Sequence, residues 1–294
     1  MSYWNERRKR RPCGVSGARA ARGSVGAAGI ENRRASGQPF YTAAAMHWEP
    51  LIPSPQLWRA GQIAGVVVLI LWPLSCAAAD PWTASIGGTS DYVYRGISQT
   101  YGGAALQLGV NYQNPLGWFA GAWGSNVDPY PGGYPSKELD LYAGFSRAIS
   151  PDFALQASYT HHAYLEDPRP GRFDYDEVSL AIGYVDLVAA SVSYEPNSSS
   201  YSDLGLARRR TTLAYEVSTR WPLRAGFALN AGGGYYDLHD LFGVGYWAGD
   251  LAVSYVYRQL TLDLRRFYCD STAARLYEDA SANRAWAVTG ILRF

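Results

Sequence analysis

Charged side chains occur at alternate positions within segments whose other positions are apolar. Residues 138 to 141, for example, read Glu, Leu, Asp, Leu. Neighbouring side chains of a β-strand point to opposite faces, so this spacing would place charges on one face and apolar side chains on the other. The charged positions of this kind carry both signs: Asp91, Glu138, Asp140, Glu177, Glu195, Glu216, Asp250 and Asp263 with Arg95, Arg220, Arg258, Arg265 and Arg293. Because enclosed charges need partners, they predict either ion pairs that fill an interior or a narrow hydrated pore that selects small solutes.

Two adjacent histidines, His161 and His162, are the residues best suited to enzyme chemistry. Hydrolases place a histidine beside a serine or a carboxylate, and Ser158 and Glu166 are close in sequence. On a strand the two histidines point to opposite faces, so at most one of them faces either partner on a given side. The sequence contains no G-x-S-x-G nucleophile motif. We therefore expect both histidines to lie at an outer rim or beside a loop, and the protein not to be an enzyme.

Metal ligands are scarce in this chain. Of its four histidines, His47 lies in a segment that we expect to be removed, which leaves His161, His162 and His239. Structural and catalytic zinc sites draw on more histidine or cysteine than this. We expect neither a metal site nor a cofactor.

From Pro81 onward, a two-residue period recurs about every 18 residues and predicts twelve strands. The predicted strands are 82 to 95, 104 to 113, 117 to 126, 137 to 148, 153 to 164, 173 to 185, 187 to 195, 210 to 220, 226 to 237, 248 to 258, 260 to 268 and 284 to 294. Short connections, such as Asp186 and Gln259, alternate with long ones, such as 196 to 209 and 269 to 283. Helical patterns are almost absent.

An even number of antiparallel strands, with tight turns at one end and long loops at the other, is the pattern of an outer-membrane β-barrel. The sequence therefore predicts an all-β fold: a single antiparallel transmembrane β-barrel of about 12 strands. In such a barrel the last strand pairs with the first, so that no backbone donor is left unpaired in lipid. The chain ends on Phe294, inside the last predicted strand. This terminal residue resembles the signal by which the outer-membrane assembly machinery recognises its substrates.

The alternation also predicts which side chains face lipid, and Leu139, Leu141, Ala143 and Phe145 are one such set. Aromatic residues fall near the two ends of the strands, as in the aromatic belts at the two membrane interfaces. The expected belt residues are Trp82, Tyr112, Trp118, Tyr184, Trp221 and Tyr257 at the periplasmic rim, and Tyr92, Tyr159, Tyr194 and Trp286 at the outer rim.

The first 79 residues differ from the rest. An apolar run at 63–72 is followed by Ala77 and Ala79, which is typical of a secretory signal with its cleavage site. Because the only internal methionine is Met46, we expect residues 1–45 to be a non-native or disordered extension, 46–79 to be a signal peptide and 80–294 to be the barrel. Lipid modification of Cys76 is an alternative.

Removal of residues 1–79 changes charge and cysteine content. They hold ten of the 26 Lys and Arg but only three of the 25 Asp and Glu, so a mildly acidic chain remains. The basic run at 7–11 could bind nucleic acid, but export would remove it, so we expect no nucleic-acid partner. Cys269 would be the one remaining cysteine, which excludes an intramolecular disulfide.

Three stretches in order, SDYVYRGISQT at 90–100, GWFAGAWGSNVD at 117–128 and KELDLYAGF at 137–145, resemble the hallmark of a proteobacterial family of exported proteins of uncharacterised function. That family is grouped with the outer-membrane β-barrels. The resemblance covers Trp82 to Phe294 and implies a barrel in the outer membrane of a Gram-negative bacterium. It implies no activity and no catalytic residues.

These observations favour a narrow porin-like channel for small solutes with a mixed-charge lumen. Its expected partners are outer-membrane lipid, the assembly machinery and small solutes. One alternative is a structural or adhesion barrel that acts through its long loops. A lipid- or peptide-hydrolysing barrel is a weaker alternative, because the sequence offers it only the two histidines.

Overall fold

The structure is a computed structural model that describes residues 81–128, 136–166, 173–185, 187–201, 207–277, 280 and 282–294. The expected signal peptide and the extension before it lie outside the described residues. Within the described ranges, no helix is long and apolar enough to cross a membrane.

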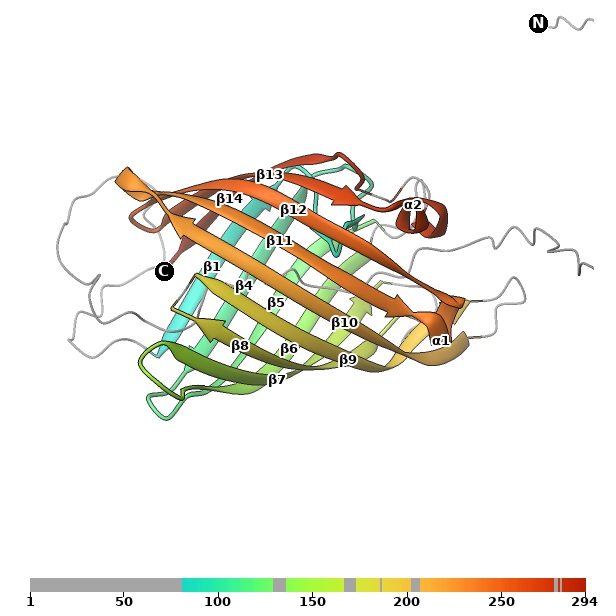
Figure 1. Cartoon of the computed structure of the whole chain (residues 1–294), viewed down its shortest axis with the longest axis horizontal. Coiled ribbons are helices and arrows are strands. Elements are labelled where there is room, and N and C mark those ends of the chain that lie inside the picture. Colours follow the sequence, from blue (N-terminus) through green and yellow to red (C-terminus); the bar gives the residue numbers. More distant parts are fainter. Residues whose placement is uncertain are drawn as a thin grey trace, which may run out of the picture. The chain divides into compact units, whose positions relative to one another are not determined.

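Twelve antiparallel strands of the described chain form a closed barrel in which strands adjacent in sequence are adjacent in the sheet (Figure 1). They are β1 (Trp82–Thr89), β4 (Ala105–Gln113), β5 (Trp118–Val127), β6 (Ser136–Ala148), β7 (Phe153–Leu165), β8 (Tyr175–Tyr184), β9 (Val188–Tyr201), β10 (Ala207–Pro222), β11 (Phe227–Leu238), β12 (Val244–Tyr257), β13 (Leu260–Cys269) and β14 (Trp286–Arg293). The prediction of an all-β, twelve-stranded antiparallel barrel is confirmed.

The barrel closes where β14 pairs with β1. In this register Ser85 lies opposite Arg293, and Gly88 lies opposite Gly290. The pairing continues to the last residue, because the Phe294 amide donates to the Ala84 carbonyl at 2.9 Å and the Ala84 amide donates to the Phe294 carbonyl at 3.2 Å. The chain therefore ends inside the sheet because its last residues complete the hydrogen bonding of the first strand.

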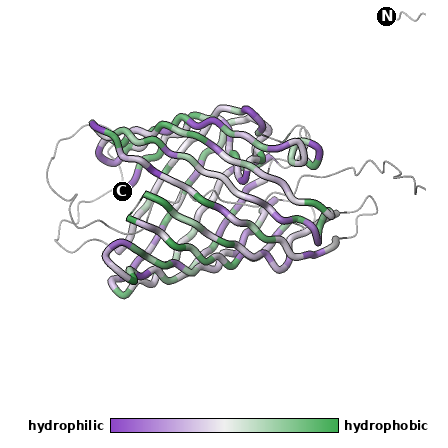
Figure 2. The backbone as a smooth tube through the Cα atoms, in the orientation of Figure 1, coloured by the Kyte–Doolittle hydropathy of each residue, from purple (hydrophilic) through white to green (hydrophobic). Residues whose placement is uncertain are grey.

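The outer wall of the barrel is apolar and the inner wall is polar, as the alternation in sequence predicts. Figure 2 shows hydrophobic and hydrophilic positions alternating along the strands. On β6, Leu141 is 49% exposed on the outer wall, whereas Glu138 and Asp140 are 2% and 0% exposed inside the barrel. A continuous surface of exposed Leu, Val and Ile side chains is suited to lipid and not to water.

Aromatic pairs surround the end of the barrel that carries the tight turns. Ring centroids lie 5.0 Å apart in Trp82–Tyr112, Trp118–Phe145 and Phe153–Tyr184, and 4.7 Å apart in Phe227–Tyr255. At the other end Tyr235 packs on Trp247 at 5.0 Å, and the Arg266 guanidinium lies over the Trp286 ring. Most of the expected belt residues are exposed on the outer wall: Trp82, Trp118, Tyr159, Tyr184, Tyr194, Trp221, Tyr257 and Trp286.

The first predicted strand, 82 to 95, is wrong beyond Thr89. The chain leaves the wall there and forms a small hairpin, β2 (Val93–Tyr94) and β3 (Ile97–Ser98), and every residue from 91 to 100 is buried. Tyr92 was expected in the outer aromatic belt, but it is 3% exposed and packs on Trp123 with ring centroids 5.5 Å apart. We call residues 90–104 the inward hairpin, because they fill the barrel at the long-loop end.

Parts of two long connections are more regular than expected. The connection predicted at 196–209 is shortened because β9 extends to Tyr201 and β10 starts at Ala207. The connection at 269–283 contains α2 (Ser271–Tyr277), and α1 (His239–Phe242) precedes β12. A single 3-10 turn, η1 (Arg224–Gly226), joins β10 to β11 at the tight-turn end. Figure 1 places α1 and α2 at the end of the barrel opposite the C-terminus.

The two faces of β8 allow a test of which side chains face lipid and which face the lumen. Leu180 is 53% exposed on the outer wall, whereas the hydroxyl of its neighbour Ser179 hydrogen-bonds inside the barrel to Glu177 at 2.8 Å. Leu180→Arg should destabilise the barrel by about 2–4 kcal/mol, because the arginine would enter the bilayer. Ser179→Arg should cost much less, because a carboxylate is within reach. Urea titration in lipid vesicles measures both values, and equal losses would contradict this orientation.

Closure by β14 gives a second test. Deletion of 290–294 removes the partners of residues 84 to 88 and leaves their backbone groups unpaired in lipid, at several kcal/mol for each group. We expect the truncated chain not to fold in detergent, as judged by loss of the heat-modifiable gel band. The control is Phe294→Ser, which keeps the backbone pairing and should fold. A truncated chain that remains heat-modifiable would contradict closure by the C-terminal strand.

Candidate functional site

The barrel encloses a cavity of about 600 Å³. It extends from residues of the β6–β7 and β8–β9 turns, such as Asp152 and Leu187, to the inward hairpin at the other end. The expected lumen residues that line it are Asp91, Arg95, Glu177, Glu216, Arg220, Asp250, Asp263, Arg265 and Arg293. Three others, Glu138, Asp140 and Glu195, are at most 2% exposed and lie inside the barrel behind this lining.

Arg258 does not belong to the lumen. It occupies the tight turn between β12 and β13, where it is exposed and has a positive φ of 54°. Its guanidinium lies over the ring of Tyr257, 5.4 Å from the centroid. The strand predicted at 248 to 258 ends one residue earlier, at Tyr257. The two-residue alternation therefore assigned Arg258 to the lumen, although it belongs to the turn.

Arg95, at the tip of the inward hairpin, is the centre of the candidate site. Its guanidinium donates to Glu195 at 2.6 Å and to Glu177 at 2.8 Å, and it lies 3.8 Å from Glu216. The three glutamates come from β9, β8 and β10, which are neighbouring strands of the wall. The side chains of Arg95, Glu177 and Glu195 are 5%, 13% and 2% exposed, so these two ion pairs are shielded from water and hold the hairpin against one side of the barrel. Glu216, at 34%, is more exposed.

Each glutamate around Arg95 has a second polar partner. Thr212 donates to Glu195 at 2.6 Å, Ser179 to Glu177 at 2.8 Å and Tyr236 to Glu216 at 2.9 Å. Buried charges are tolerated when their remaining lone pairs are also satisfied. The wall strands therefore hold the three glutamates in position around the Arg95 guanidinium.

The turn of the hairpin explains why a glycine follows Arg95. Arg95 and Gly96 have φ values of 49° and 79°, the two positive values that a two-residue type I′ turn requires. A side chain at position 96 would also place its Cβ 2.5 Å from the Cβ of Ala248 on β12. The turn thus brings the backbone against the wall and directs Arg95 to the glutamates.

Apolar contacts seal the hairpin into the barrel. On one side Ile97, 2% exposed, packs in a cluster with Tyr236, Tyr246 and Tyr277. On the other side Tyr92 and Tyr94 belong to a cluster with residues of β5, β7 and β8, namely Val127, Tyr164 and Tyr175. Tyr246 also donates to the Arg95 carbonyl at 3.1 Å. Among the described residues, the hairpin is therefore the main element that fills the long-loop end of the lumen.

A second group of charges lies on β12 and β13. Arg265 is hydrogen-bonded to Asp250 and lies 3.1 Å from Asp263. This side chain is 17% exposed and lines the cavity. These charges are therefore paired with one another, and the same side chains also line the cavity.

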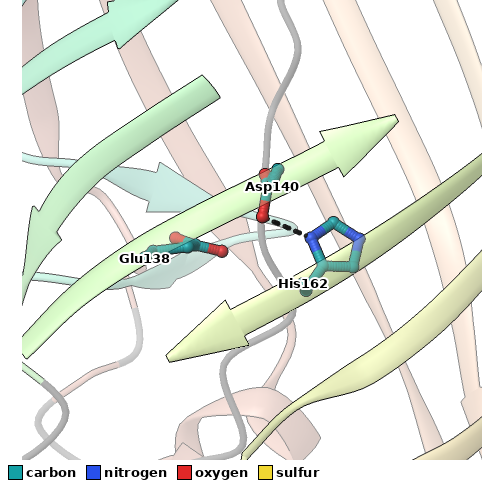
Figure 3. A group of neighbouring side chains, drawn as sticks. All are labelled: Glu138, Asp140 and His162. Carbon is teal, nitrogen blue, oxygen red and sulfur yellow. Dashed lines mark hydrogen bonds and ion pairs between the residues drawn. The ribbon is translucent and has the colours of Figure 1, made fainter. Parts of the chain in front are cut away.

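The side chains of His161 and His162 lie on opposite faces of the barrel wall. His162 lies inside the barrel, 2% exposed, with its Nδ1 2.7 Å from Oδ1 of Asp140 (Figure 3). His161 is 41% exposed and its Nδ1 is 2.9 Å from Oδ1 of Asp176. His162 is close to a loop, as expected, but its burial was missed because the pairing of Asp140 with His162 depends on the register of two strands.

The geometry around His162 gives little support to hydrolysis. Its Nδ1 is hydrogen-bonded to Asp140 and its Nε2 has no hydrogen-bond partner, so within the described ranges no serine hydroxyl is held by the ring for proton abstraction. Ser158 and Thr160 line the same cavity, but neither is bonded to the ring.

Comparisons with known proteins identify a family and a fold. Residues 75–285 match the model of the family described as "Bacterial protein of unknown function (Gcw_chp)", and the chain belongs to that family. Among solved structures, the NanC porin has a TM-score of 0.50 at 9% identity, covering 72% of this chain and 98% of the porin. The KdgM porin has a TM-score of 0.46 at 8% identity, covering 72% of this chain and 98% of that one. No curated protein matches the sequence. The barrel thus has the fold of outer-membrane porins.

Two glycines of the inward hairpin test its packing. Gly96 and Gly102 both have positive φ, 79° and 77°, but only at Gly96 would a Cβ meet other atoms, since nothing lies within 4 Å at Gly102. Gly102→Ala should cost about 1–2 kcal/mol from backbone strain alone. Gly96→Ala should cost clearly more, because the hairpin must move away from Ala248. Urea titration of the refolded proteins compares them, and equal losses would show that the hairpin does not press on β12.

Proposed function

We propose that this member of a bacterial family of unknown function is a narrow porin-like channel of the Gram-negative outer membrane through which small solutes pass. The observation that carries the proposal is the cavity, which has charged side chains in its lining and runs from the tight-turn end to the inward hairpin. The apolar outer wall, the aromatic bands and the porin fold support a place in the membrane. Lipid and, through the terminal Phe294, the assembly machinery are the proposed partners.

The size of the cavity limits what can enter it. A volume of about 600 Å³ is within the range of sites for small organic molecules, roughly 300–1,000 Å³. Twelve strands give a lumen between the filled interior of eight-stranded barrels and the open channel of larger porins. The proposed solutes are therefore single small molecules or ions rather than polymers.

The lining favours cations. Six carboxylates line the cavity, Asp91, Asp152, Glu177, Glu216, Asp250 and Asp263, against four arginines, Arg95, Arg220, Arg265 and Arg293. An excess of one sign in a narrow, low-dielectric passage raises the local concentration of the opposite sign. Arg95 stands where the passage is narrowed by the hairpin, and its ion pairs hold that constriction in place.

A second function is favoured by one observation. The long-loop end of the lumen is filled by the hairpin and two buried clusters, so a barrel that never opens would serve as a structural or adhesive element. A measurement of ion conductance distinguishes the two functions. A structural barrel would conduct neither as the wild type nor after replacement of Arg95. We propose no reaction for His162, in keeping with the expectation that the protein is not an enzyme.

Substitution of the arginine at the constriction gives the direct test. Arg95→Gln leaves three glutamates without their cation, which should cost about 3–5 kcal/mol of stability and loosen the hairpin. In planar bilayers we expect a larger single-channel conductance than that of the wild type and a stronger preference for potassium over chloride. The matched control is Arg220→Gln, which removes an arginine of the same cavity that lies on the wall and not on the hairpin.

The outcome that would contradict the channel is specific. Absence of conductance in both the wild type and Arg95→Gln, with both proteins heat-modifiable and inserted, would favour the structural barrel. A rise in conductance of the same size in Arg220→Gln would show that Arg95 has no special part in the constriction.

A further inference from the structure

Three ionisable side chains converge on the inner wall beside the inward hairpin (Figure 3). Glu138 and Asp140 are two residues apart on β6 and so share a face, and the register places His162 of β7 directly opposite Asp140. They are 2%, 0% and 2% exposed. We call these residues the Glu138 cluster.

Each member of the Glu138 cluster has one polar atom without a partner. The atoms are Oε2 of Glu138, Oδ2 of Asp140 and Nε2 of His162, all inaccessible to solvent. Leaving such a group unsatisfied costs about 1–3 kcal/mol, and more when the group is charged. Figure 3 shows Nε2 of His162 on the side of the ring away from Glu138 and Asp140, so an ion shared by the three residues would bind Nδ1 and replace its hydrogen bond to Asp140. The two unpaired carboxylate oxygens are the groups that such an ion would satisfy.

Among the described residues, no lysine or arginine forms an ion pair with Glu138 or Asp140. Arg95, at the tip of the inward hairpin, already faces three other carboxylates, Glu177, Glu195 and Glu216. This end of the described interior therefore holds more carboxylates than cationic groups. A doubly charged cation between Glu138 and Asp140 would balance both of them while His162 stays neutral.

The distances suit a single ion. One ligand atom from each residue lies within 4.8 Å of the other two. Ligands held about 2.1 Å from a tetrahedrally coordinated metal are about 3.4 Å apart, so the side chains would close by up to about 1.4 Å around the ion. His162 also lines the cavity, so the cluster adjoins the lumen.

We propose that the Glu138 cluster binds a divalent first-row transition metal such as Zn²⁺ or Mn²⁺. An imidazole with two carboxylates is a ligand set for these ions, whereas Mg²⁺ and Ca²⁺ prefer oxygen ligands alone. Outer contacts hold the ligands: Tyr164 donates to Oε1 of Glu138 at 3.3 Å, and the His162 ring stacks on Tyr175 at 4.3 Å.

The metal would connect the wall to the hairpin. The Tyr92 hydroxyl, at the start of the hairpin, is also hydrogen-bonded to the Glu138 carboxylate. Fixing that carboxylate on an ion would therefore fix the base of the hairpin. This proposal does not rest on the proposed channel, because binding is measured on the folded barrel without any transport.

The test is a titration of the refolded barrel in detergent with ZnCl₂ and MnCl₂ by calorimetry, with MgCl₂ for comparison. We expect one Zn²⁺ or Mn²⁺ per chain and no saturable uptake of Mg²⁺ in the same range. Electron paramagnetic resonance of the Mn²⁺-loaded wild type should show coupling to an imidazole nitrogen. A wild type that takes up neither ion, or Mn²⁺ without nitrogen coupling, would overturn the proposal.

Variants identify the ligands. Glu138→Gln and His162→Gln should each weaken binding at least about tenfold, the loss that even outer partners of a metal site cause. The matched control is His161→Gln, which changes the neighbouring histidine on the outer wall and should leave the dissociation constant unchanged. Heat-modifiable migration checks that each variant is folded, and if neither ligand variant folds, the nitrogen coupling of the wild type decides. Unchanged binding in both folded ligand variants, or loss in His161→Gln, would place the ion elsewhere and overturn the proposal.

Discussion

Closure of the sheet is the constraint on which the rest of the structure depends. The outer wall offers lipid an apolar surface, and a backbone amide or carbonyl left unpaired there would cost several kcal/mol. Pairing of β14 with β1 removes both edges at once, and the hydrogen bonds between Ala84 and Phe294 carry that pairing to the last residue. Alternate side chains are then divided between lipid and lumen, which is why charges can be gathered inside the barrel.

The interior is organised around one inserted element. The inward hairpin enters the long-loop end and presents Arg95 to three glutamates of neighbouring strands, while Tyr92 reaches toward Glu138. Removal from water makes these interactions strong and makes their loss costly. The same burial leaves polar atoms of the Glu138 cluster without hydrogen-bond partners. The constriction and the proposed metal site therefore lie in one region that is rich in carboxylates.

The sequence predicted what is local and periodic. Strand number, closure and the opposite facing of residues such as Leu141 and Asp140 follow from a two-residue period. The inward hairpin was missed because 82 to 95 continues the strand pattern, although three consecutive large residues from Tyr92 to Tyr94 followed by Arg95 and Gly96 fit a buried turn better than a wall strand. The pairing of Asp140 with His162 depends on register between strands, which no single segment encodes.

Burial of the hairpin is the central claim, and thiol labelling tests it most directly. Ile97→Cys, in a Cys269→Ser background, places a thiol where the native side chain is 2% exposed. A membrane-impermeant maleimide added to intact cells should label it far more slowly than Glu166→Cys, whose native side chain is 55% exposed at the same end of the barrel. Adding Arg95→Gln should speed the labelling at position 97. Labelling at position 97 as fast as at position 166 would show that the hairpin lies outside the lumen and would contradict the account.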